Sequence, residues 1–235
     1  MKTRAELKNE AKGVLRGRWK DSILMSLVPT LVSIAIGLLL FFLLVIPTIT
    51  FVQNNSDLLN STANYDGNSG GSGGSFIGGI IGALFSAGIS WTFLDLIRGK
   101  RQNIRPFSDA FRGFGGPVVL GVICIYLLMA IFIFLWSLLL VIPGIIKGYS
   151  YSQAYFIYYD RYEETDMRPG FLECITRSKH MMKGYKGQLF ILDLSFIGWH
   201  ILAILTAGIG YLWLTPYITA TKAAFYENLP KTATV

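Results

Sequence analysis

The chain has 235 residues, of which 52% are hydrophobic and only 15% charged, and its formal net charge is +7. This composition excludes a mainly soluble protein and indicates a membrane protein. In a soluble chain the positive charge would suggest nucleic acid, but here the cations flank apolar runs. Orientation in the membrane and anionic lipid headgroups explain them better, so we expect membrane lipids, and no nucleic acid, as partners.

One stretch of the sequence indicates a membrane fold most clearly. No charged residue occurs from Val118 through Ile146. A helix needs roughly 20 apolar residues to cross a bilayer core of about 30 Å, and this run is longer. Pro143-Gly144 interrupts it, and an apolar but tyrosine-rich run continues to Tyr159. The pattern predicts a membrane hairpin.

The whole chain predicts a single all-α membrane domain, a polytopic bundle of six transmembrane helices in three pairs. An amphipathic interfacial helix precedes each pair. The expected elements are a cytoplasmic amphipathic helix at 1–22, spans at 23–52 and 76–97 joined by an external Gly/Ser-rich loop at 53–75, a cytoplasmic basic loop at 98–116, spans at 117–142 and 145–160, a cytoplasmic amphipathic segment at 161–187, and spans at 188–206 and 211–227.

The N-terminal helix begins with Thr3 and Glu6 at the spacing of a capping box. Its apolar stripe lies among basic residues, which is typical of a helix in the membrane interface. The same stripe would also suit a helix docked onto the protein's own cytoplasmic face. The first span contains Pro29 and Pro47 and is longer than required, so we expect a tilt or a kink.

Two further patterns concern packing. A basic-Gly-aromatic step recurs before three of the spans, at Arg16-Gly17-Arg18-Trp19, Arg112-Gly113-Phe114 and Lys183-Gly184-Tyr185, and indicates an internal repeat. The second span carries small residues at every fourth position, which let helix backbones approach closely in lipid. They are Gly78, Gly82, Ser86 and Ser90.

Ionisable side chains inside spans are costly and need a partner or a wet cavity. The candidate intramembrane polar site consists of Asp193, His200, Lys222, Thr219, Lys147 and Tyr151. Interhelical hydrogen bonds would explain the same residues without any ligand. Helix geometry puts Asp193 and Lys222 at similar depths on neighbouring antiparallel helices, so we predict that they pair. The candidate contacts to anionic headgroups are Arg16, Arg18, Arg112, Lys179 and Lys183.

The sequence offers little catalytic chemistry. It contains no zinc-protease helix, no nucleophile elbow and no paired intramembrane carboxylates. Two histidines, His180 and His200, stand apart from the cysteines and acidic residues that would complete a metal site. We therefore expect no catalytic residues, no metal and no cofactor.

Several motifs resemble a multi-pass membrane-protein family of Gram-positive-type bacteria whose function is unknown. They are Met182-Lys183-Gly184, Leu192-Asp193-Leu194-Ser195-Phe196-Ile197-Gly198-Trp199, Thr206-Ala207-Gly208-Ile209-Gly210, Pro216-Tyr217, Leu140-Val141-Ile142-Pro143-Gly144-Ile145-Ile146-Lys147 and Tyr151-Ser152. That family is distantly similar to the membrane domain of some glycerophosphodiester phosphodiesterases. The resemblance implies a multi-pass fold but no activity, since this chain has no soluble phosphodiesterase domain.

These observations favour a non-enzymatic plasma-membrane protein that handles or transports a lipid or a small amphipathic molecule in a polar intramembrane cleft. A second hypothesis is an accessory or scaffold protein that docks another membrane protein or a second copy of itself. An intramembrane enzyme is the third. A ligand bound in the cleft would favour the first hypothesis, and a stoichiometric protein partner the second.

Orientation follows from the basic residues. Apart from Lys147, every Lys and Arg falls at the N-terminus, in the two basic loops or toward the C-terminus, and the loop at 53–75 has none. The positive-inside rule then puts both termini in the cytoplasm. A cysteine introduced at Ser69 should react with an impermeant thiol reagent on intact cells, and one at Gln102 should not. The reverse pattern would overturn the orientation, and labelling at both positions would contradict the span count.

Overall fold

The computed structural model describes residues 1–54 and 72–230, and every regular element in these ranges is a helix. The predicted all-α class is therefore confirmed for the described part. The predicted external loop falls largely on residues 55–71, outside the described ranges. The elements are α1 (Arg4–Leu15), α2 (Trp19–Leu40), the π-helical η1 (Phe41–Val45), α3 (Ile46–Asn54), α5 (Ser72–Ile97), α6 (Pro106–Ala110), the 3-10 helix η2 (Phe111–Phe114), α7 (Gly116–Leu139), α8 (Val141–Tyr151), α9 (Ala154–Thr165), α10 (Phe171–Met181), α11 (Lys186–Leu194), α12 (Ile197–Leu205) and α13 (Tyr211–Glu227).

Four helical stretches in the described ranges are long and apolar enough to cross a membrane, which makes this a membrane-associated chain. They are Trp19–Phe51, Ile77–Ile97, Val118–Leu138 and Lys186–Leu205. The prediction of six spans is not confirmed. The predicted span 145–160 is divided between α8 and α9, and the predicted span 211–227 is the 17-residue α13.

The division between α8 and α9 has a local cause. Ser152 Oγ donates to the Tyr149 carbonyl (2.9 Å), and the Gln153 amide donates to Ser178 Oγ (3.2 Å) on α10. Short polar side chains thus take up backbone groups that a continuous helix would pair internally. The helix breaks at Ser152 and Gln153, where hydropathy alone predicts continuity.

The first apolar stretch is one helical run through α2, η1 and α3, in spite of Pro29 and Pro47. Ser33 Oγ donates to the Pro29 carbonyl (2.8 Å), and the π-helical turn Phe41–Val45 lies just before Pro47. Proline has no backbone N–H to donate and its ring crowds the preceding turn, and a wider π-helical turn accommodates it within the helix. At 1.5 Å per residue the run is about 54 Å long, more than the roughly 30 Å of a bilayer core.

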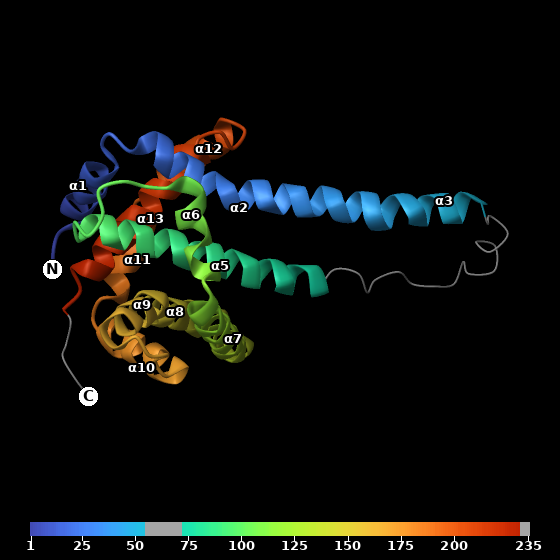
Figure 1. Ribbon diagram of the computed structural model, residues 1–235. Helices are drawn as coiled ribbons and strands as arrows, with labels where there is room; N and C mark the ends of the chain where they lie inside the picture. Colours follow the sequence, from blue (N-terminus) through green and yellow to red (C-terminus); the bar gives the residue numbers. More distant parts are fainter. Residues whose placement is uncertain (55–71, 231–235) are drawn as a thin grey trace.

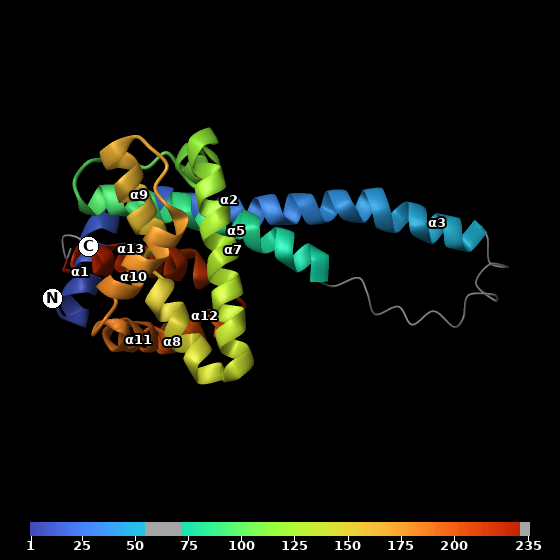
Figure 2. The same cartoon turned by 90° about the horizontal axis from the view of Figure 1, so that it is seen from below.

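Figure 1 shows α2, α3 and α5 leaving a compact body in the same direction, while Figure 2 shows α7 running across that direction. The body contains α1, α9, α10, α11 and α13. No residue in the most apolar part of Trp19–Phe51 is buried, whereas two thirds of the corresponding part of Ile77–Ile97 is buried. Lipid therefore has to cover α3 and the C-terminal half of α2, and the C-terminal half of α5 belongs to the core.

Aromatic contacts join α5, α9 and α13 at the centre of the body. The Trp91 indole donates to the Tyr155 carbonyl (2.9 Å), and its ring stacks on that of Tyr159 at 5.1 Å between centroids. Phe156 of α9 stacks on Tyr226 of α13 at 4.8 Å. Buried aromatic pairs of this kind stabilise by about 0.5–1.5 kcal/mol beyond the area they bury.

A charged cluster joins the same three helices, at the C-terminal ends of α5 and α13 and in the middle of α9. The Arg98 guanidinium donates to both oxygens of Asp160 (2.6 and 2.9 Å) and to Glu227 (2.6 Å). Tyr226 Oη donates to Asp160 as well (2.8 Å). Burial acts to lower the pKa of Arg98, but the hydrogen bonds to Asp160 and Glu227 outweigh it and hold the pKa above its ordinary value. One cation thus links the ends of α5 and α13 to the middle of α9.

The glycines of the recurring basic-Gly-aromatic step have two different structural roles. Gly17 and Gly184 have φ of +78° and +88° and end the segments of α1 and α10 in the left-handed conformation. Gly113 instead permits close packing, because a Cβ there would lie 2.0 Å from the Leu84 carbonyl oxygen of α5. Its neighbour Arg112 is thereby held beside α5.

The N-terminal helix is docked on the protein. Its capping box is present, with Glu6 accepting from the Thr3 amide (2.7 Å) and Thr3 Oγ1 accepting from the Glu6 amide (3.4 Å). The apolar residues Leu7, Ala11 and Leu15 are fully buried, and α1 packs along α13. Of the two alternatives for this helix, the structure therefore favours docking onto the body over lying in the membrane interface.

The Arg98 cluster generates a stability prediction. Arg98→Met leaves Asp160 and Glu227 without their common cation, and removing one partner of a buried ion pair costs about 3 kcal/mol. The matched control is Lys100→Met, since the Lys100–Glu163 pair is 48% and 35% exposed and should contribute less than about 1 kcal/mol. Unfolding in mild detergent measures both free energies. Equal losses for the two variants would contradict a central role for Arg98.

Candidate functional site

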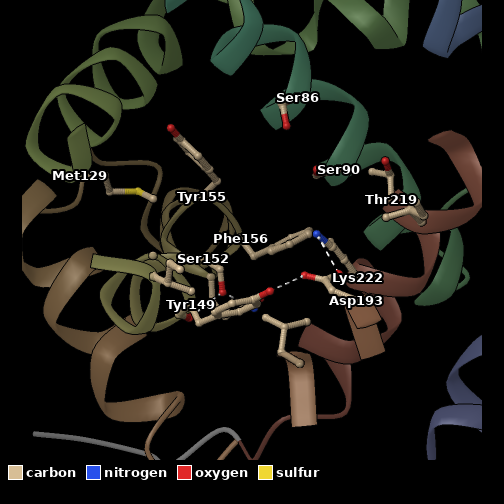
Figure 3. A pocket seen from close by; sticks show the side chains of 15 residues that line it. Ser86, Ser90, Met129, Tyr149, Ser152, Tyr155, Phe156, Asp193, Thr219 and Lys222 are labelled. Carbon is tan, nitrogen blue, oxygen red and sulfur yellow. Dashed lines mark hydrogen bonds and ion pairs between the residues drawn. The ribbon is translucent and has the colours of Figure 1, made fainter. Parts of the chain in front are cut away.

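A cavity of about 490 Å³ lies between α5, the helices around the α8–α9 break, α11 and α13 (Figure 3). This volume is within the roughly 300–1,000 Å³ of small-molecule sites. The lining combines polar and apolar side chains. The lining residues are Ser86, Ser90, Met129, Ile145, Gly148, Tyr149, Ser152, Gln153, Tyr155, Phe156, Leu189, Asp193, Ile218, Thr219 and Lys222.

An ion pair stands in the polar wall. Lys222 Nζ on α13 lies 3.1 Å from Asp193 Oδ1 on α11, and Tyr149 Oη donates to Asp193 Oδ2 (3.3 Å). The predicted pairing of Asp193 with Lys222 is therefore confirmed. The Lys222 and Asp193 side chains are 43% and 27% exposed, so the pair opens into the cavity instead of being sealed by protein.

Local structure explains the position of the carboxylate. Asp193 stands in the last turn of α11, just before the helix stops at Ser195 and Phe196. Ser195 Oγ donates to the Leu192 carbonyl and takes up one of the free groups at this helix end. Asp193 thus lines the cavity from the end of α11, where it faces Lys222 on α13.

Hydroxyl and amide groups extend the polar wall. Ser86 and Ser90 come from α5, and Thr219 from the same helix as Lys222. Gln153 is 2% exposed; its Nε2 donates to Ser152 Oγ (2.9 Å), but its Oε1 has no partner among the described residues. A buried acceptor without a partner is costly. Gln153 therefore offers an unused acceptor to a hydrogen-bond donor in the cavity.

Three predicted site residues lie elsewhere. Lys147 Nζ lies 4.1 Å from the ring centroid of Trp136 on α7. Tyr151 is buried against Phe132, also on α7. His200 on α12 contacts the hydroxyl of Tyr211 (3.3 Å), next to the turn into α13.

The single polar seam inferred from the sequence is therefore wrong as to its extent, since only Asp193, Lys222 and Thr219 meet in the cavity. Sequence reasoning missed Tyr149 and Gln153. Gln153 carried a signal, because an amide in the middle of an apolar run requires a partner.

Of the residues predicted to contact lipid headgroups, some are exposed and others form hydrogen bonds within the protein. Arg16, Lys179 and Lys183 are exposed. Arg18 donates to backbone carbonyls, those of Gln102 (2.6 Å) and Val14 (3.0 Å). These contacts fix the loop after α5 to the end of α1.

Arg112 is used inside the protein, which corrects its assignment as a headgroup contact. It donates to Asp95 (2.9 Å) and to Tyr159 Oη (2.9 Å). Burial acts to lower the pKa of Arg112, but Tyr159 and Asp95 hold it above its ordinary value. The side chain thus joins η2 to α5 and α9.

A double-mutant cycle tests the ion pair. Asp193→Asn leaves Lys222 without its counter-ion and should destabilise the protein, while adding Lys222→Met should restore part of the loss. For contacting residues we expect a coupling free energy of about 1 kcal/mol. Thermal unfolding in detergent gives the four stabilities. Asp193→Asn combined with Lys20→Met, on exposed Lys20, is the control and should be additive; additivity in both cycles would refute the pair.

The comparisons with known proteins assign no activity to this chain. Neither the curated proteins nor the solved structures contain a match to this chain. One family model, described as a protein of unknown function, matches residues 1–147 and residues 137–233. Together these matches extend over nearly the whole sequence. The chain therefore belongs to the family of proteins of unknown function called DUF975.

Proposed function

We propose that this protein is a non-enzymatic protein of the bacterial plasma membrane that binds and handles a lipid or a small amphipathic molecule in the cavity around Asp193 and Lys222. The observation that carries the proposal is the ion pair opening into that cavity. A carboxylate and an ammonium 3.1 Å apart complement a polar group that carries charge or several hydrogen-bonding atoms.

The apolar lining residues supply the second half of the recognition. Met129, Ile145, Leu189 and Ile218 line the same cavity as the polar groups. Burying hydrocarbon stabilises a complex by about 25 cal/mol per Å². A ligand with a polar head and an apolar tail can contact both the polar and the apolar lining residues, whereas a fully polar solute cannot bury hydrocarbon against the apolar ones.

Hydrogen bonding in the cavity supports binding over catalysis. Ser86 and Ser90 line it, but in the described part of the chain neither donates to Asp193 or accepts from Lys222. Nucleophilic catalysis needs a hydroxyl within hydrogen-bond reach of its base. The groups present are suited to holding a ligand in place.

For the orientation we retain both termini in the cytoplasm, on the distribution of Lys and Arg. The exposed Arg16, Lys179 and Lys183 would then lie near anionic headgroups of the inner leaflet, each contributing about 1 kcal/mol. The relation to Gram-positive-type bacteria and to the membrane domain of glycerophosphodiester phosphodiesterases rests on motif resemblance, and no phosphodiester hydrolysis is inferred from it.

A second candidate function is an accessory protein for another membrane protein. The observation in its favour is the outer half of α5, where Cβ atoms at Gly78 and Gly82 would have nothing within 4 Å. Small residues on an open helix face suit the close approach of a further transmembrane helix. Such a partner would cover the continuation of the α5 face from which Ser86 and Ser90 line the cavity.

Native mass spectrometry from mild detergent tests the proposed function. The wild-type chain should retain an amphiphile, and Lys222→Met should weaken its retention about tenfold, since a hydrogen bond to a charged group contributes about 1.5–3 kcal/mol. Lys20→Met, which removes the same charge from the surface, should leave retention unchanged. An identical ligand complement in all three proteins would contradict the cavity as the site, and a stoichiometric protein partner would favour the accessory function.

A further inference from the structure

A second hollow lies on the other side of α13, where the end of α1, the start of α2, α12 and α13 meet. Its volume is about 470 Å³ and its wall is almost entirely apolar. We call it the tryptophan groove. It is lined by Lys12, Trp19, Trp199, Leu202, Ala203, Thr206, Ile209, Gly210, Trp213, Leu214 and Tyr217, none of which belongs to the polar cavity.

The turn between α12 and α13 builds one wall. Thr206 Oγ1 donates to the Ala203 carbonyl (2.9 Å) and accepts from the Gly210 amide (3.0 Å), so the polar groups of this turn are satisfied internally. Gly210 packs so closely that a Cβ there would lie 2.7 Å from Ala203 Cα. The turn presents a tight, apolar surface in which backbone groups are not left for water.

Aromatic side chains form much of the remaining lining. Three of the five tryptophans of the chain line the groove, and Trp199 and Trp213 remain 52% and 51% exposed. Tryptophan concentrates at the level where acyl chains meet headgroups, because its ring is apolar and its N–H is polar. The groove therefore has the surface of a site at the edge of the hydrocarbon layer.

One cation stands at the end of this groove. Lys12, in the last turn of α1, has its Nζ 5.8 Å from the ring centroid of Tyr217. No acidic residue lines the groove, and within the described ranges no carboxylate forms an ion pair with Lys12. Its neighbour Lys8 is instead engaged, over the Phe196 ring (4.2 Å) and with the Ser195 carbonyl (3.3 Å).

We propose that the tryptophan groove binds an anionic phospholipid of the surrounding bilayer, with one acyl chain along the tryptophans and the headgroup phosphate on Lys12. The apolar wall requires a hydrocarbon occupant, and the single cation without a carboxylate selects an anionic head over a zwitterionic one. This site is independent of the proposed function, because it shares no residue with the polar cavity.

The tryptophans provide the measurement, since bromine quenches indole fluorescence on close contact. The full chain carrying Trp136→Phe is reconstituted into vesicles of one phosphatidylglycerol–phosphatidylcholine mixture, with brominated chains on either lipid in turn. Trp136 lies on α7 outside the groove. Brominated phosphatidylglycerol should quench the groove tryptophans more strongly than brominated phosphatidylcholine at the same mole fraction.

Two variants tie that preference to the groove. Lys12→Met should lower it about fivefold, the equivalent of one near-surface charge, while Lys20→Met should leave it unchanged. A protein in which Trp19, Trp199 and Trp213 are Phe and Trp136 is retained should show no preference. Equal quenching by the two lipids, or equal effects of Lys12→Met and Lys20→Met, would overturn the proposal. So would a shift of the emission that depends on protein concentration, because it would make a second copy of the chain the occupant.

Discussion

Three of the helices that line the polar cavity, α5, α9 and α13, are joined by one guanidinium, that of Arg98. Arg98 directly follows α5 and connects Asp160 in the middle of α9 with Glu227 at the C-terminal end of α13. Without it, two carboxylates on neighbouring helices would face each other in a partly buried place, which is unfavourable. Because Ser86 and Ser90 lie on α5, Lys222 on α13 and Gln153 directly before α9, the cluster that fixes these helices also fixes the spacing of the cavity wall.

Helix interruptions then give the cavity its polarity. A continuous apolar helix satisfies its own backbone and offers lipid only side chains, whereas a break frees polar groups that protein or ligand must satisfy. Within residues 1–54 and 72–230, two such breaks lie beside the cavity, at Ser152–Gln153 and at Ser195–Phe196. Gln153 brings an unused acceptor to the first, and Asp193 precedes the second. The tryptophan groove has the opposite character, since the turn that forms its wall satisfies its own polar atoms.

Sequence reasoning succeeded where a single local pattern decides the structure. The capping box at Thr3, the apolar helices and the pairing of Asp193 with Lys222 follow from spacing and from the cost of an isolated charge in lipid. It was less successful where tertiary contacts compete with a pattern. Lys147 has the polarity expected of a cavity residue, but it lies over Trp136. The backbone N–H of Gln153 donates to the Ser178 hydroxyl on α10. No periodicity within residues 145–160 could reveal that partner.

A map of the full chain in lipid nanodiscs, obtained by electron cryomicroscopy, is the most direct test of amphiphile binding at the Asp193–Lys222 pair. We expect elongated density in the polar cavity, with its head within hydrogen-bond distance of Lys222 or Gln153 and its tail against Met129 and Leu189. A cavity filled by the protein's own side chains, with Asp193 and Lys222 sealed on all sides, would contradict the proposed function and leave the pair a purely structural one.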